Sequence, residues 1–217
     1  MNRPRTRLSL RSQQAGFTIV ELMIATAVFA IILILITVAI LQITRVYYKG
    51  VTESNTQNTA RAIIDDISQA IQFSGGQVTP TPGNAAGNSY AFCVGQQQFS
   101  YVLGYQVVDN PDGTSAQSPH GLVQNTVSNC PSTPAPNLRG AGSVPGRELL
   151  DQNMRLANLS VTSVGPNMWK IVVRVVYGDD AILQNPTSPT ASCQGTTTGT
   201  QFCAVSELTT TVEKRVQ

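Results

Sequence analysis

The sequence predicts an α+β protein in which a long N-terminal helix, apolar in its first half, precedes a β-rich head. Three observations carry this prediction. An apolar run fills residues 22–41, and an amphipathic helical pattern follows it through residues 60–71. After residue 74 the hydrophobic period changes from 3.6 to 2, and strand-like runs alternate with connectors rich in Gly and Pro.

The apolar run has the length of one membrane crossing. Eighteen of the twenty residues from 22 to 41 are hydrophobic, the exceptions being Thr26 and Thr37. At about 1.5 Å per residue, a helix of this length spans about 30 Å. Basic side chains precede it with no acidic residue among them, so the positive-inside rule keeps the leader in the cytoplasm and exports the rest. These side chains are Arg3, Arg5, Arg7 and Arg11.

An acidic residue, Glu21, stands at the edge of this run. Placing an ionised carboxylate in hydrocarbon costs roughly 2.5 to 3.5 kcal/mol on insertion scales, and such groups are normally paired and functional. Glu21 is therefore expected to have a partner.

The residues around Glu21 form a recognisable motif. Residues 15–22 are Ala-Gly-Phe-Thr-Ile-Val-Glu-Leu. This segment resembles the cleavage and N-methylation site of type IV prepilins and of the pseudopilins of type II secretion. All five features of that site are present: a basic leader, Gly16 before the scissile bond, the apolar Phe17 after it, Glu21 four positions further on, and a membrane helix.

The resemblance implies processing, assembly and location. A prepilin peptidase would cut between Gly16 and Phe17, and the new Phe17 amine would be N-methylated. Glu21 of one subunit would pair with the Phe17 amine of its neighbour in an apolar filament core, which is favourable only when both charges are present. The implied partners are other pilins or pseudopilins, the prepilin peptidase, the inner-membrane assembly platform and the lipid bilayer. The implied location is a single pass through the inner membrane with an extracytoplasmic head, then a pilus or pseudopilus.

The expected organisation is a cleaved leader at 1–16, a long helix at 17–76 whose membrane part is 17–43, and a globular head at 77–217. The expected function is that of a minor type IV pilin, which primes a filament or sits in it or at its tip. A minor pseudopilin of type II secretion and a signal-anchored protein outside any filament are the alternatives. No Pro or Gly weakens the helix from residue 17 to 49, which favours a minor component.

The second half of the helix is expected to pack on the head. Its apolar residues recur at spacings of three and four, which is the stripe of an amphipathic helix. Residues 52–59 before the stripe are polar on every face, but they contain no Pro or Gly, so one continuous helix ending at Gly75 and Gly76 is expected. The stripe comprises Ala60, Ile63, Ile64, Ile67, Ala70 and Ile71.

Beyond the helix, the clearest strand covers residues 168–177, where Ile171, Val173 and Val175 lie on the face expected to pack on the helix. The other expected strands are residues 90–94, 99–108, 121–127, 156–164 and 205–216, and the expected loops are 75–89, 110–119, 131–146 and 178–200. The resemblance to pilins implies the same arrangement, with an antiparallel sheet packed on the helix.

Four cysteines in an exported head predict two disulfides. Three pairings are possible. Cys193 and Cys203 enclose nine residues that can close a local loop, which leaves Cys93 to pair with Cys130. No two cysteines have CxxC spacing, so a zinc site or a thioredoxin-like redox motif lacks its parts.

The sequence argues against an enzyme and against metal or cofactor binding. The single histidine, His120, lies in a loop-like context and is interpreted as a solvated surface group. The adjacent pair Asp179 and Asp180 is interpreted as a solvated turn, with a calcium site as the alternative.

Nucleic-acid binding is also disfavoured. Without the four leader arginines, 10 basic residues remain against 12 acidic ones, so the processed chain has a net charge of −2. The candidate basic patch is weak against that balance and is interpreted as a solvated strand face. It comprises Lys170, Arg174, Lys214 and Arg215.

Overall fold

The computed structural model describes residues 16–74, 77–85, 88–113, 116–131, 135–140, 144–195 and 199–215. The leader arginines, Gly75, Gly76 and Val216 lie outside the described residues. The chain divides into two compact units, Met1–Thr44 and Arg45–Gln217.

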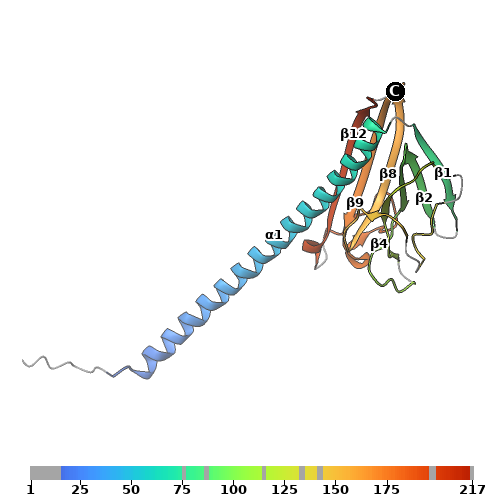
Figure 1. The fold of residues 1–217 in the computed structure, drawn as a ribbon. Coiled ribbons are helices and arrows are strands. Elements are labelled where there is room, and N and C mark those ends of the chain that lie inside the picture. The colour runs from blue at the N-terminus through green and yellow to red at the C-terminus, as the bar shows by residue number, and fades with distance from the viewer. Residues whose placement is uncertain are drawn as a thin grey trace, which may run out of the picture. The chain divides into compact units, whose positions relative to one another are not determined.

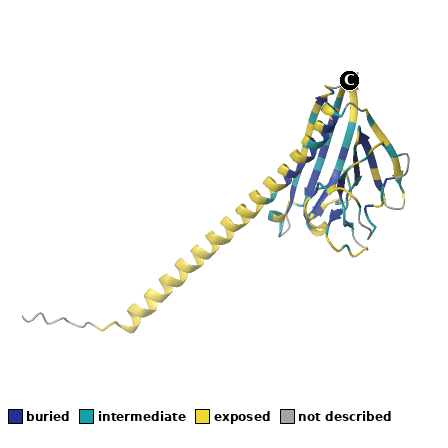
Figure 2. Cartoon of the chain, viewed as in Figure 1, coloured by how far each residue is buried: buried dark blue, intermediate teal, exposed yellow. Residues whose placement is uncertain are grey.

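The first unit contains the N-terminal part of one helix, α1 (Ile19–Phe73). This helix is long and apolar enough to cross a membrane, with a mean hydropathy of 3.1 over its most apolar 18-residue window. Every residue from 16 to 51 is exposed in the single chain, as the yellow part of the helix in Figure 2 shows. A helix segment that is apolar on all sides and exposed along its length fits a lipid or filament environment.

The second unit begins within α1 and contains all the strands. The helix passes without a break through the polar segment 52–59, as the resemblance to pilins implied, although the polar sequence alone would also have allowed a break there. The predicted stripe from Ala60 to Ile71 is buried, and Thr56 and Thr59 extend the buried face toward the N-terminus. The hydroxyl of Thr56 donates to the Thr52 carbonyl at 2.8 Å, and that of Thr59 donates to Asp151 at 2.9 Å. These bonds let polar residues lie on a packed face.

The helix packs on a five-stranded sheet of order β12-β9-β8-β4-β5, part of which is visible beside the C-terminal part of α1 in Figure 1. Ile171, Val173 and Val175 of β9 are fully buried in the same core cluster as the helix stripe, which confirms the face predicted from their alternation. The strands are β4 (Gln106–Val107), β5 (Gln117–Ser118), β8 (Met154–Gly165), β9 (Met168–Tyr177) and β12 (Ala204–Glu213). All pairs are antiparallel except β4 with β5.

A second five-stranded sheet, antiparallel throughout, has the order β1-β2-β3-β6-β7. The head therefore contains two large sheets where one was expected. The strands are β1 (Val78–Asn84), β2 (Ser89–Val94), β3 (Gln97–Val102), β6 (Leu122–Thr126) and β7 (Arg147–Glu148).

The expected strand 99–108 is in fact two strands in different sheets. Residues up to Val102 belong to β3, and Gln106 and Val107 belong to β4. The chain turns between them at Gly104, which has a φ of 77° and donates its N–H to the Leu156 carbonyl at 2.8 Å. A Cβ at this position would lie 2.8 Å from the Thr187 backbone, so only glycine fits the corner.

The expected loop 75–89 was also wrong in part, because residues 78–84 of it form β1. Pro80 and Pro82 argued against a strand there. Proline is tolerated in strands at a sheet edge, and β1 is an edge strand.

The expected loop 178–200 also contains two short strands that pair antiparallel, β10 (Leu183–Gln184) and β11 (Ser192–Cys193). Two 3₁₀ turns flank them, η1 (Asp180–Ile182) and η2 (Thr200–Phe202).

Candidate functional site

The N-terminal motif places a carboxylate at the first turn of α1. Gly16, Phe17 and Thr18 precede the helix, and Glu21 lies in its first turn. The Glu21 backbone N–H donates to the Thr18 hydroxyl at 3.2 Å. In return, the Thr18 N–H and hydroxyl each lie 3.4 Å from Glu21 Oε2. This reciprocal pattern is a capping box, and it directs the carboxylate back toward Thr18, the residue after Phe17.

The two threonine hydroxyl groups of the apolar run form hydrogen bonds within the helix. Thr26 donates its hydroxyl to the Met23 carbonyl at 3.0 Å, and Thr37 donates to the Leu33 carbonyl at 2.8 Å. Glu21 is different, because an ionised carboxylate in an apolar environment needs a cation that the helix does not supply. Among the described residues of the first unit, none is a Lys, Arg or His. Within the described part of this unit, Glu21 is therefore left without a basic side chain as a partner.

In the head, both cysteine pairs form disulfides. Cys93 on β2 is bonded to Cys130, and Cys193 on β11 is bonded to Cys203, with Cα–Cα distances of 5.8 Å in both cases. These are the two pairs that the spacing favoured. The first links a sheet strand to the segment after β6, and the second closes the loop that precedes β12.

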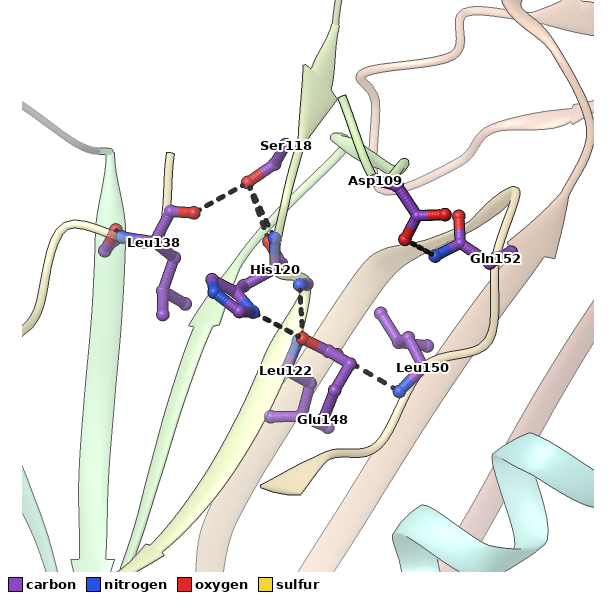
Figure 3. Close-up of polar contacts among 10 residues, drawn as sticks. Asp109, Ser118, His120, Leu122, Leu138, Glu148, Leu150 and Gln152 are labelled. Atoms are coloured by element: carbon purple, nitrogen blue, oxygen red, sulfur yellow. Dashed lines mark hydrogen bonds and ion pairs between the residues drawn. The ribbon is translucent and has the colours of Figure 1, made fainter. Parts of the chain in front are cut away.

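The single histidine faces an acidic partner. His120 Nδ1 lies 3.5 Å from Glu148 Oε2, and both side chains are only about one-quarter exposed. The Glu148 carboxylate also accepts backbone N–H groups of Gly121 at 3.1 Å, Leu122 at 2.9 Å and Leu150 at 3.2 Å. Figure 3 shows this carboxylate facing the imidazole and the backbone of β6 and of the segment after β7. The interpretation of His120 as a solvated surface group was therefore wrong.

The electrostatics of Glu148 balance burial against hydrogen bonding. Burial raises the pKa of the Glu148 carboxyl above its ordinary value, while the three backbone N–H groups and His120 act to lower it. Ser118 lies nearby, but its hydroxyl contacts the carbonyl oxygens of His120 at 2.7 Å and Leu138 at 3.0 Å. The described contacts join the His120 ring to Glu148 and not to Ser118, so they form a structural tie rather than a nucleophile and its base.

A buried cation organises the end of the other sheet. Arg155 on β8 is fully buried, and its Nη2 lies 2.6 Å from Asp180 Oδ1. Its guanidinium also donates to the carbonyl oxygens of Gly104, Gly178 and Pro186 at 3.1 to 3.4 Å. Asp179 accepts a bond from Gln106 at 2.9 Å. Both residues are exposed, as expected of a solvated turn, but their carboxylates also contact Gln106 and Arg155, which the sequence did not predict.

The guanidinium of Arg155 occupies the position in this turn where a calcium ion would have to bind. Carbonyl and carboxylate oxygens are the ligands that Ca²⁺ prefers, and here Arg155 already binds them. Within the described residues, no group of three or more His, Cys, Asp or Glu side chains is arranged to hold a metal ion. Of the four cations in the candidate basic patch, Arg174 is already engaged, since it pairs with Glu207 at 2.7 Å and donates to the Ala191 carbonyl.

Sequence reasoning missed both Glu148 and Arg155. Their main partners are backbone groups and side chains 20 or more residues away, which no local motif marks. The only available signal was an ionisable residue beside a run expected to be buried, Arg155 immediately before the expected strand 156–164.

Comparison with known proteins bears on the N-terminal segment. Residues 11–41 match the family model described as the prokaryotic N-terminal methylation motif. No curated protein and no solved structure significantly matches the chain. The matched motif, the apolar helix and the disulfide-bonded α+β head together support a place for this chain in the type IV pilin and pseudopilin family.

Proposed function

We propose that this chain is a minor type IV pilin, a structural subunit that primes a pilus filament or sits in it or at its tip. In this proposal the prepilin peptidase cuts after Gly16, and the exposed Phe17 amine is N-methylated. The chain is held in the inner membrane by the first part of α1 until it enters the filament, with its head outside the cytoplasm. No catalytic step is assigned to the head.

The observation that carries the proposal is the single unpaired charge of the apolar segment. Glu21 lies one helical turn from Phe17, and the described residues of the first unit offer it no basic side chain. After processing, Phe17 carries an amine, which is the missing cation. When subunits pack side by side, the Phe17 amine of one chain and the Glu21 carboxylate of the next neutralise each other in an apolar environment.

Two further observations favour a filament subunit. The apolar surface of α1 is exposed on all sides over residues 16–51, so a partner of similar character is needed once the subunit leaves the lipid. The helix is also continuous from Ile19 to Phe73. A helix without a weakening Pro or Gly in its membrane part should stay helical when it leaves the membrane. This suits a subunit that nucleates assembly better than one whose helix must extend within the filament shaft.

The decisive experiment replaces Glu21 with Val in the native host and compares the amount of protein in membranes and in sheared filaments. Loss of one partner from a buried pair costs about 3 to 5 kcal/mol, so depletion from filaments by more than about a hundredfold is expected, with normal membrane levels. Thr26→Val is the matched control, because it removes a polar group from the same segment without removing charge.

Mass spectrometry of the wild-type protein from filaments completes the test. The proposal requires an N-terminus at methylated Phe17. An intact Met1 terminus would instead identify a signal-anchored protein, and so would a Glu21→Val variant that behaves like the wild type. Incorporation of the processed chain into a secretion pseudopilus rather than a pilus would favour the pseudopilin alternative.

A further inference from the structure

A polar groove of about 630 Å³ lies on the head, where the C-terminal end of α1 meets the turn between β2 and β3. Four of its lining residues belong to the end of α1, one directly follows the helix, and three belong to the β-sheet with order β1-β2-β3-β6-β7 or to its turns. They are Asp66, Gln69, Ala70, Phe73, Ser74, Gln96, Gln97 and Gln124. All of them belong to the second unit, so the groove is a feature of the head alone.

Four of the lining residues are glutamines, and a side-chain amide presents an acceptor oxygen and a donor nitrogen in one plane. Two of them form an ordered row, since Gln124 Nε2 lies 3.4 Å from Gln97 Oε1 and Gln97 Nε2 lies 3.4 Å from Thr126 Oγ1. Gln69 and Gln96 are exposed. The amide oxygen and nitrogen can bind two neighbouring hydroxyl groups of a sugar ring, because one hydroxyl can donate to the oxygen while the other accepts from the nitrogen.

The charge of the groove is neutralised internally. Asp66 pairs with Arg147 at 2.7 Å, and Arg147 Nη2 also lies 2.9 Å from Gln124 Oε1. The carboxylate and the guanidinium keep the ability to bind hydroxyl groups, but together they offer no net charge to an ionic ligand. The groove therefore favours a ligand that is polar and uncharged.

The groove also has an apolar surface and an unsatisfied hydroxyl. Phe73, the last residue of α1, is 59% exposed and lines the groove, so it supplies an apolar surface there. The Ser74 hydroxyl oxygen is buried and has no hydrogen-bond partner among the described residues. A ligand with an apolar C–H face would cover Phe73, and its hydroxyl groups would meet the side-chain amides that line the groove.

We propose that this groove binds a neutral oligosaccharide. A pyranose ring combines an apolar C–H face, which stacks on an aromatic side chain, with neighbouring hydroxyl groups for the planar amides. An extended peptide is a poorer match, because the groove is lined by side chains and offers no open row of backbone groups for strand addition. The inference goes beyond the proposed function, since sugar binding by the head does not depend on assembly of the helix.

The test uses the full chain in lipid nanodiscs, which avoids detergents with sugar head groups. Maltotriose, cellotriose and the trimer of N-acetylglucosamine are titrated and followed by saturation-transfer NMR. At least one is expected to bind saturably with a Kd of about 1 mM, typical of a site with few polar contacts. Phe73→Ala and Gln96→Ala are each expected to weaken that binding at least about tenfold.

Gln57→Ala is the matched control, because Gln57 is an exposed glutamine on the same helix but away from the groove. Its affinity should equal that of the wild type. Both Phe73 and Gln96 are exposed, so their variants should fold, which unchanged Trp169 fluorescence would verify. The proposal fails if none of the three sugars binds, or if binding survives unchanged in both groove variants.

Discussion

Arg155 and Asp180 form an ion pair with 2.6 Å between Nη2 and Oδ1, although the arginine side chain is fully buried and the aspartate is 43% exposed. The pair joins the start of β8 to the turn after β9. Because the guanidinium also binds three carbonyl oxygens, it holds the corner at Gly104 and the loop at Pro186 in place. A single buried charge thus connects four segments that are distant in sequence.

Replacement of Arg155 by Met should destabilise the head strongly. It removes the donor for three backbone carbonyls as well as the partner of Asp180, and breaking a buried pair on one side costs up to about 3 to 5 kcal/mol. Denaturant unfolding of the full chain in nanodiscs, followed by the fluorescence of Trp169, measures the loss. Arg147→Met is the control, because its pair with Asp66 is mostly exposed and should contribute about 0 to 1 kcal/mol. Equal effects of the two substitutions would contradict the assignment.

The pH dependence of stability should carry a contribution from Glu148. Burial raises its folded pKa above the ordinary value of 4.5. A carboxyl with a raised folded pKa binds its proton more tightly in the folded state. Its stabilising contribution is therefore fully present below the ordinary pKa and is lost as the pH rises through the folded pKa. The stability advantage of the wild type over Glu148→Gln should accordingly be largest near pH 4 and should shrink toward neutral pH.

The same unfolding assay, repeated over this pH range, tests the sign. Comparison in a His120→Asn background removes the neighbouring titratable group, so that the remaining trend belongs to Glu148. An advantage that grows as the pH rises would mean that the N–H groups of Gly121, Leu122 and Leu150 outweigh burial, and the assigned direction of the pKa shift would be wrong.

The two disulfides should differ in their contribution to stability. Cys93 and Cys130 are 37 residues apart, whereas Cys193 and Cys203 are 10 apart. In the chain-entropy model these loops correspond to about 4 and about 3 kcal/mol, so the double Cys→Ala variant of the first pair should be the less stable. Peptide mapping without reduction should recover these two pairs. A peptide that links Cys130 to Cys193 would contradict the pairing.

The sequence predicted those parts of the fold that depend on local pattern. The stripe on α1 and the alternation along β9 each specify a buried face, and both faces meet in one core. The corner at Gly104 was not predictable, because its need for glycine comes from the Thr187 backbone, which is far away in sequence. Strand β1 was missed because two prolines argue against a central strand and say nothing about an edge.

The same division holds for functional residues. Gly16, Phe17 and Glu21 form a motif with fixed spacing, so the sequence alone suffices to propose them as the processing and assembly site, and this assignment stays a prediction. The contacts of Glu148 and Arg155 are largely hydrogen bonds to backbone N–H and carbonyl groups. Every residue has such groups, so only the folded chain shows which of them lie next to a charged side chain.

At the start of α1, Glu21 has two possible roles that a substitution by Val does not separate. Its carboxylate belongs to the capping box with Thr18, and it is also the proposed partner of a neighbouring Phe17 amine. Glutamine is accepted at the same position of a capping box but carries no charge. Glu21→Gln therefore removes the charge and keeps the cap, whereas Thr18→Val removes the capping hydroxyl and keeps the charge.

If the charge pair drives assembly, Glu21→Gln should be processed, should accumulate in the membrane and should be as depleted from sheared filaments as Glu21→Val. Thr18→Val should remain in filaments, because loss of a helix cap costs only about 0.5 to 2 kcal/mol and leaves the ion pair intact. Immunoblots of membrane and filament fractions, normalised to the wild type, distinguish the two roles. The reverse result, with Thr18→Val depleted and Glu21→Gln retained, would assign Glu21 to the start of the helix and leave the neighbour's amine without its proposed partner.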